Sequence, residues 1–136
     1  MTDDSLENTK LNVAVLIGED FFRKRSFDAI NALAINPMAF EFSDTLLDEL
    51  IAAQPIGIVV DLEDENFSAL SVLAAIRATP ELADVPYIAY SAFDREDIIV
   101  SAAALGITHV IRSVYAADLV KLIRDFLPDL DEDTAD

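Results

Sequence analysis

Residues 55–67 read PIGIVVDLEDENF, and this stretch decides the fold. The apolar run before Asp61 has the length and the β-branched content of a strand that is buried on both faces. Directly after Asp61 the chain places three more carboxylates, Glu63, Asp64 and Glu65. Because an ionised carboxylate is costly to bury, we expect a strand at 56–62 whose carboxyl end opens onto a cleft at Asp61.

The rest of the chain alternates between segments with strand character and segments with helical spacing. Apolar runs of strand length predict four further strands, at residues 11–17, 38–42, 85–93 and 107–114. Apolar residues at helical spacing predict five helices, at residues 20–35, 43–54, 67–79, 94–106 and 116–127. Strands that alternate with helices favour right-handed crossovers and parallel pairing. The prediction is an α/β domain with a doubly wound, five-stranded parallel sheet and five helices.

Length, charge and cysteine content bound the organisation of the chain and its partners. The chain has 136 residues, a formal net charge of −17 and no cysteine. We expect a flexible N-terminus at 1–10, one domain at 11–127 and an acidic C-terminal tail at 128–136. The negative charge opposes binding to nucleic acid and to anionic membranes. Without a recognisable signal peptide, membrane span or disulfide framework, the sequence favours a cytoplasmic protein.

Parallel strands place their carboxyl ends at one edge of the sheet, where ligands bind in such folds. At these ends the sequence has acids, a hydroxyl and a guanidinium: Glu19, Asp20, Asp61, Glu63, Ser91 and Arg112. Converging carboxylates repel one another unless a cation neutralises them, and carboxylate and carbonyl oxygens are Mg²⁺ ligands. The candidate Mg²⁺ ligands are therefore Glu19, Asp20, Asp61 and Glu63. A carboxylate beside Mg²⁺ also acts as a nucleophile towards phosphoryl groups, whose oxygens a hydroxyl and a cation then bind.

Three stretches stand out together: IVVDLEDENFSALSVLAAIR (58–77), VPYIAYSAFD (85–94) and VIRSVYAADLVKLI (110–123). They resemble the third strand with its helix, the fourth strand, and the last strand, loop and helix of response-regulator receiver domains of the chemotaxis-regulator type. The resemblance covers about residues 11–127. It implies a flavodoxin-like sheet with strand order 2-1-3-4-5. It also implies that Asp61 is the phosphoacceptor, that Ser91 supplies the hydroxyl, and that Mg²⁺ is the cofactor.

The chain departs from the receiver pattern at the ends of its first and fifth strands. Receivers have an acid pair after the first strand, whereas Gly18 aligns here with the first acid and Glu19 with the second, leaving Asp20 as a spare. Receivers have Lys-Pro after the fifth strand, where this chain has Arg112 and Ser113. An ungapped alignment instead places Ser113 at the Lys position, and both alternatives stay open. In either case the lysine is absent.

Two further positions differ from the family. Asp64 and Glu65 follow Asp61 where receivers commonly have Pro and Gly, and their charge opposes a phosphoryl donor. His109 stands three residues before Arg112, where the resemblance implies an aromatic residue coupled to the strand-four hydroxyl. One interpretation is that His109 makes this switch sensitive to pH. The other is a histidine with no such role in a half-exposed strand.

These features favour a stand-alone, atypical receiver domain that acts in signal transduction through protein–protein contacts, with phosphorylation at Asp61 weakened or lost. The first alternative is a working phosphorelay receiver, phosphorylated on Asp61, with Mg²⁺ held by Glu19, Asp61 and the carbonyl of Glu63. The second alternative is a flavodoxin-like protein that binds a nucleotide or a flavin. A receiver is not an enzyme beyond the Mg²⁺-dependent self-phosphorylation and dephosphorylation of its aspartate.

The expected partner is a protein. The resemblance implies a histidine kinase or a downstream effector. The helix predicted at 94–106 is apolar around much of its circumference, so exposure of Ile98, Val100 or Leu105 would make it a partner surface. Many receivers use the face of the fourth helix, fifth strand and fifth helix in this way, and a homodimer through that face is a further expectation.

Overall fold

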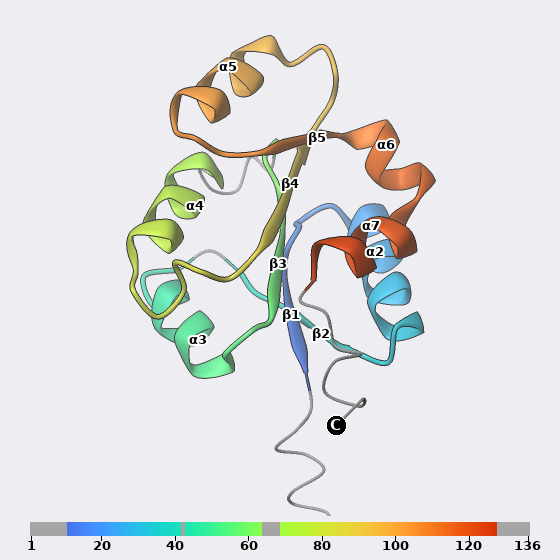
Figure 1. The fold of residues 1–136 in the computed structure, drawn as a ribbon, viewed down its shortest axis with the longest axis vertical. Coiled ribbons are helices and arrows are strands. Elements are labelled where there is room, and N and C mark those ends of the chain that lie inside the picture. The colour runs from blue at the N-terminus through green and yellow to red at the C-terminus, as the bar shows by residue number, and fades with distance from the viewer. Residues whose placement is uncertain (1–10, 42, 64–68, 128–136) are drawn as a thin grey trace, which may run out of the picture.

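A sheet of five parallel strands in the order β2-β1-β3-β4-β5 forms the middle layer of the protein (Figure 1). The computed structural model describes residues 11–41, 43–63 and 69–127. The strands are β1 (Asn12–Leu16), β2 (Asn36–Ala39), β3 (Gly57–Asp61), β4 (Tyr87–Ser91) and β5 (His109–Ile111). This order confirms the predicted doubly wound sheet. The predicted flexible N-terminus and acidic tail lie outside the described residues.

Six helices are present in the described ranges: α2 (Asp20–Ala32), α3 (Leu46–Ala53), α4 (Ala69–Ala78), α5 (Glu96–Ala104), α6 (Arg112–Ala117) and α7 (Leu119–Phe126). Figure 1 shows α2 and α7 on one side of the sheet and α3 and α4 on the other. Helices α5 and α6 lie near the end at which the strands finish. Within these ranges, no helix combines the length and apolar character needed to cross a lipid bilayer.

The central strand β3 supplies side chains to an apolar core on each face of the sheet, because successive residues of a strand point to opposite faces. Ile58 and Val60 belong to the core that is closed by α3, α4 and α5. Val59 belongs to the core that is closed by α2, α6 and α7. All five residues of β3 are buried. Leu62, which follows the strand, is also buried in the core, so the chain leaves the interior at Glu63.

The C-terminal part of the fold corrects the prediction of five helices and of a strand at 107–114. The strand stops at Ile111, and an additional helix, α6, begins at Arg112. Tyr115 of this helix is fully buried, and its ring stacks on that of Tyr90 with 4.6 Å between the centroids. Its hydroxyl forms a 2.5 Å hydrogen bond with that of Ser26 in α2. These long-range contacts explain the helix, which a short apolar run does not distinguish from a longer strand.

Strand β2 also differs from its prediction at 38–42, because it lies at Asn36–Ala39 and contains Pro37. In the described sheet β2 is an edge strand that pairs with β1 alone. Proline has no backbone N–H, so it is tolerated where no second neighbour needs that donor. The predicted end of the strand, Phe42, lies outside the described residues.

The two stacked tyrosines provide a matched test of this core. Tyr115→Phe removes the partner of the buried Ser26 hydroxyl, so we expect the free energy of unfolding to fall by about 1 kcal/mol. The Tyr90 hydroxyl is buried without a hydrogen-bond partner among the described residues, so Tyr90→Phe should leave stability unchanged or raise it. Urea unfolding of both variants measures the difference. Equal losses in the two variants would contradict this account of the core.

Candidate functional site

The candidate site lies at the edge of the sheet where β1, β3, β4 and β5 finish. Asp61 is paired in register with Tyr90, and Ser91 with Ile111, so these strand ends are adjacent. Asp61 is 8% exposed. One of its carboxylate oxygens accepts a 2.9 Å hydrogen bond from the backbone N–H of Glu63. The carboxylate of Asp61 is thus held at the opening of the interior by the turn that follows it.

The two acids after β1 have their own partners within the first turn of α2. Glu19 is the N-cap of this helix, and its carboxylate accepts hydrogen bonds from the N–H groups of Phe22 (2.8 Å) and Phe21 (3.2 Å). Such a cap satisfies N–H groups that have no partner inside the helix. Asp20 forms an ion pair with Arg23. Glu19 and Asp20, two of the four predicted Mg²⁺ ligands, therefore stabilise the start of α2.

Arg23 strengthens this arrangement from inside the same helix. Its guanidinium donates to the backbone carbonyl oxygens of Gly18 (3.1 Å) and Ile17 (3.3 Å), at the end of the first strand segment. Arg23 thus bridges the carboxylate of Asp20 and the turn that carries Glu19. An incoming cation would meet this guanidinium beside the acids.

Glu63 accepts hydrogen bonds from three separate segments of the chain. The backbone N–H of Ala92 donates to its carboxylate at 2.5 Å. Arg95 donates at 3.2 Å and Arg112 at 3.4 Å. The Glu63 side chain is only 17% exposed, so water screens these contacts less than it screens a fully exposed pair. The sequence pointed to the carbonyl of Glu63 as a ligand, but not to the role of its carboxylate.

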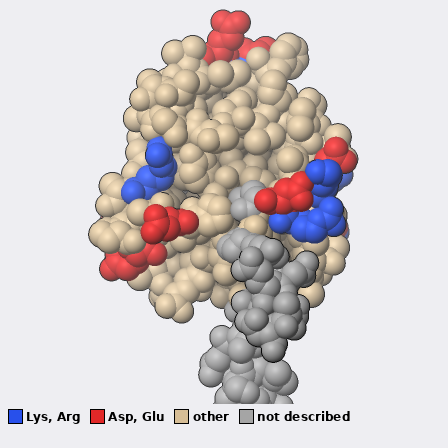
Figure 2. All heavy atoms as spheres, in the orientation of Figure 1, with Lys and Arg blue, Asp and Glu red and all other residues tan. Residues whose placement is uncertain are grey.

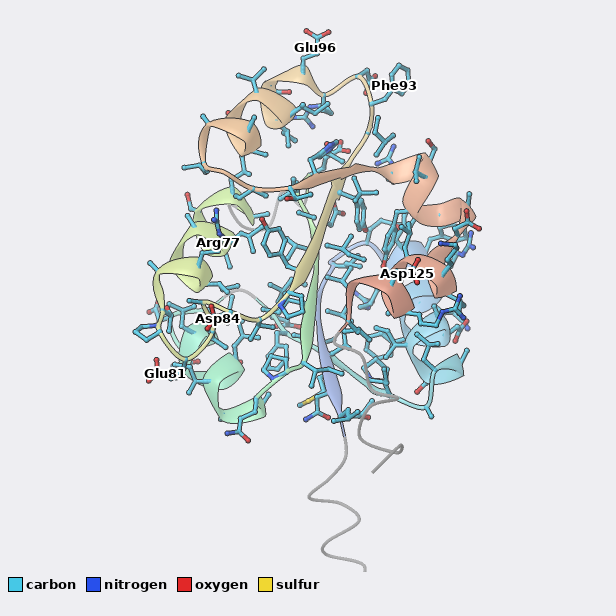
Figure 3. All side chains as sticks on the ribbon, viewed as in Figure 1. Arg77, Glu81, Asp84, Phe93, Glu96 and Asp125 are labelled. Carbon is cyan, nitrogen blue, oxygen red and sulfur yellow. The ribbon has the colours of Figure 1, made fainter. Side chains whose placement is uncertain are left out.

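Arg112 is the first residue of α6 and reaches back over the strand ends. Besides its contact with Glu63, its guanidinium lies over the ring of Phe22, 5.9 Å from the centroid. Ser113, the other candidate for the lysine position, is exposed. An open hollow of about 310 Å³ lies beside Arg112 and is lined in part by Phe22 and Phe93. Figure 3 shows Phe93 projecting outward from the segment between β4 and α5.

Ser91 and His109 contact one another across β4 and β5. The Ser91 hydroxyl and Nε2 of His109 are 2.5 Å apart, a hydrogen-bond distance. Ser91 is fully buried, and His109 is half-buried. Burial lowers the pKa of the His109 imidazole, which favours its neutral form. The hydroxyl at the end of β4 is therefore held by a titratable ring on the neighbouring strand.

Tyr90 is the register partner of Asp61 and lies on the face of the sheet opposite to the Ser91 side chain. Burial, assisted by the negative charges of Asp61 and Glu19, raises the pKa of the Tyr90 hydroxyl far above its usual range. The hydroxyl therefore stays protonated, and it lies within the electrostatic reach of the acids at the strand ends.

The donor set offers a limited fit to Mg²⁺. Within residues 11–41, 43–63 and 69–127, no group of three or more acid, histidine or cysteine side chains is arranged to hold a metal ion. Glu19, Asp20 and Glu63 instead use their carboxylates on donors of the chain. Asp64 and Glu65, expected to add negative charge near Asp61, lie outside the described residues.

Titration of His109 should be visible in the stability of the protein. In the unfolded chain the imidazole binds a proton as the pH falls through about 6.5, whereas in the folded chain its lowered pKa delays this step. The contribution of His109 is thus fully present above that pH and declines below it. We expect the free energy of unfolding to fall more steeply between about pH 7 and pH 5 in the parent than in His109→Gln. Urea unfolding across this range tests this, and parallel pH profiles would refute it.

Comparison with known proteins places this geometry in a fold family. No family model and no curated protein matches the chain. Among solved structures, the signal receiver domain of a DNA-binding response regulator (merR) from Colwellia psychrerythraea 34H matches with a TM-score of 0.70 and 18% identity, covering 85% of this chain and 97% of that one. The chemotaxis protein CheY4 of Vibrio cholerae matches with a TM-score of 0.72 and 12% identity, covering 88% of this chain and 100% of that one.

A third match is the receiver domain of the sensor histidine kinase PA1611 from Pseudomonas aeruginosa PAO1, whose structure has a magnesium ion coordinated in the active site cleft. Its TM-score is 0.68 at 13% identity, and it covers 87% of this chain and 98% of that one. At such low identities the similarity concerns the path of the backbone. The chain therefore has the fold of response-regulator receiver domains.

Proposed function

We propose that this protein is an atypical receiver domain that transmits a signal through contact with a protein partner, and that phosphorylation at Asp61 is weakened. One observation carries the proposal. Asp61 ends the central strand next to the end of β4, in the position that the resemblance to receivers assigns to the phosphoacceptor, while the carboxylates of Glu19, Asp20 and Glu63 bind groups of the chain itself. The acceptor position is thus retained in a site that has few ligands ready for a metal.

The charges around the site support a weakened phosphorylation of Asp61. A phosphoryl group on Asp61 would add close to two negative charges, and these need cations nearby. Arg112 is the cation at the end of β5, but its hydrogen bond goes to Glu63. Arg112 is also less suited than lysine to act as a compact point charge, because its charge is spread over a planar fork. A phosphoryl donor therefore approaches a cation that already has an anionic partner.

A working, Mg²⁺-dependent receiver is the second candidate, and it has some support. The receiver domain of PA1611 has the same fold and coordinates magnesium in its active site cleft. In this chain Glu19, Asp61 and the carbonyl of Glu63 would hold the ion, and Mg²⁺ would neutralise charge between the carboxylate and a phosphoryl group. For this, Glu19 must share its carboxylate between the ion and the two N–H groups at the start of α2.

The partner surface that we propose lies on α5, β5 and α7. Val100 of α5 is 67% exposed and Leu105, directly after the helix, is 46% exposed, whereas Ile98 is buried in the core. Figure 2, in the orientation of Figure 1, shows a broad area near α5 and β5 with few acids or bases, whereas α7 carries the exposed charged residues Lys121, Arg124 and Asp125. An uncharged area on a chain with a net charge of −17 suits contact with an effector or with a second copy of the chain.

Intact mass after incubation with acetyl phosphate and Mg²⁺ tests the proposal. We expect little or no phosphoryl adduct on the parent protein and none on Asp61→Asn, because Arg112 and the nearby acids are already paired. An unrelated working receiver, labelled in parallel, is the positive control. Stoichiometric labelling of the parent that is lost in Asp61→Asn would favour the working receiver instead.

Mg²⁺ binding gives an independent measurement. Calorimetric titration of the parent should show weak binding, since the Glu19 carboxylate already accepts two helix N–H groups and Asp20 is paired with the Arg23 guanidinium. The informative quantity is the difference between the parent and Asp61→Asn, because the many surface acids bind cations weakly in both. Tight, saturable binding by the parent alone would contradict the weakened site.

A further inference from the structure

The carboxylate of Glu63 joins three segments that are distant in sequence. Its donors are 29, 32 and 49 residues away, at Ala92, Arg95 and Arg112 respectively. Ala92 directly follows β4, Arg95 is the N-cap residue of α5, and Arg112 begins α6. One side chain thus ties the turn after β3 to the segments that start two helices.

These donors form a set suited to a small oxyanion. A backbone N–H and two guanidinium groups converge on the two carboxylate oxygens, with Ala92 and Arg112 on Oε2 and Arg95 on Oε1. Donors of these types bind carboxylate and phosphate alike, and charged donors form the stronger hydrogen bonds. The arrangement is chemically an anion site whose occupant belongs to the chain.

The two arginines are not equivalent in this site. Arg95 also donates to both carboxylate oxygens of Asp97, at 3.1 Å and 3.0 Å, so its charge is shared. Arg112 is bonded to Glu63 and packs on the ring of Phe22. Without Glu63, Arg95 would keep a carboxylate partner, whereas Arg112 would lose the partner that this hydrogen bond provides. Arg112 is therefore the donor whose charge depends most on the occupant.

The occupant is also linked directly to Asp61. The backbone N–H of Glu63 donates to the Asp61 carboxylate at 2.9 Å, while the side chain of the same residue fills the anion site. Glu63 therefore contacts Asp61 through its backbone and the anion site through its side chain. Glu63 is thus the residue that links Asp61 to the anion site.

We propose that Glu63 is an internal anionic ligand that occupies the site formed by the Ala92 N–H, Arg95 and Arg112, and that a phosphate-sized oxyanion binds there only by displacing it. While Glu63 is bound, it holds the β4–α5 segment and the start of α6 in one arrangement. The role of this displacement in signalling rests on the proposed function, because Glu63 would then compete with a phosphoryl group on Asp61 for the same donors. The occupancy itself rests on the contacts alone.

Binding of inorganic phosphate, followed by calorimetry and by the amide resonance of Ala92, tests the proposal. If Glu63 fills the site in nine of ten molecules, its removal should raise the apparent phosphate affinity about tenfold. We expect at least this gain in Glu63→Ala and also in Glu63→Gln, which keeps the side-chain volume. Arg112→Ala, added to Glu63→Ala, should abolish most of the gain.

Glu96→Gln is the matched control, because it removes one negative charge from the first turn of α5, near the same site. Glu96 points outward at the end of the molecule, as Figure 3 shows. We expect its phosphate affinity to stay within about twofold of the parent, since the loss of one exposed charge is largely screened. If Glu63→Ala is not folded, Glu63→Gln supplies the comparison.

Equal phosphate affinity in the parent and in both folded Glu63 variants would overturn the proposal, and so would an equal gain in Glu96→Gln. These outcomes are separate from those of the proposed function, because phosphate binding needs no covalent step at Asp61. Stoichiometric labelling of the parent by acetyl phosphate would contradict the weakened acceptor while leaving the phosphate affinities as measured.

Discussion

The burial of β3 on both faces is the constraint on which the rest of the structure depends. This strand lies between β1 and β4, and all of its residues are buried. Helices must therefore cover each face, and the connections between parallel strands supply them. Because all of these strands run parallel, their carboxyl ends lie at one edge of the sheet. Polar groups that cannot enter the interior gather there, which is how a hydrophobic requirement creates a site rich in charge.

The part of the structure that could be predicted is the part that depends on local pattern. The apolar run before Asp61 marks a buried strand in any context, and the alternation of strands with helices limits the sheet to a few topologies. Because parallel strands finish together, the sequence could also predict that Asp61, Ser91 and Arg112 lie at the same edge of the sheet. Helix α6 and the register of β2 could not be predicted, since Tyr115 and Pro37 depend on distant partners for their environments.

The groups that balance the charge of these acids could not be predicted from the sequence either. Converging carboxylates indicate a need for positive charge, but they do not say whether a metal or the chain supplies it. With 26 acids and nine basic residues, the pairing is decided by the fold. Here helix N–H groups stabilise Glu19, an arginine in the same helix stabilises Asp20, and two arginines from other segments stabilise Glu63. Much of the negative charge at the strand ends is thus balanced by N–H groups and arginines of the chain itself.

The stacked rings of Tyr90 and Tyr115 have a practical consequence. The chain has no tryptophan and only three tyrosines, so its near-ultraviolet absorption and emission come chiefly from these phenols. Two of them are fixed in one buried stack, and the hydroxyl of Tyr90 senses the charges of Asp61 and Glu19. The protein therefore carries an intrinsic optical probe directly beneath its candidate site. Changes in charge at the strand ends can be followed by tyrosine fluorescence or circular dichroism without any attached label.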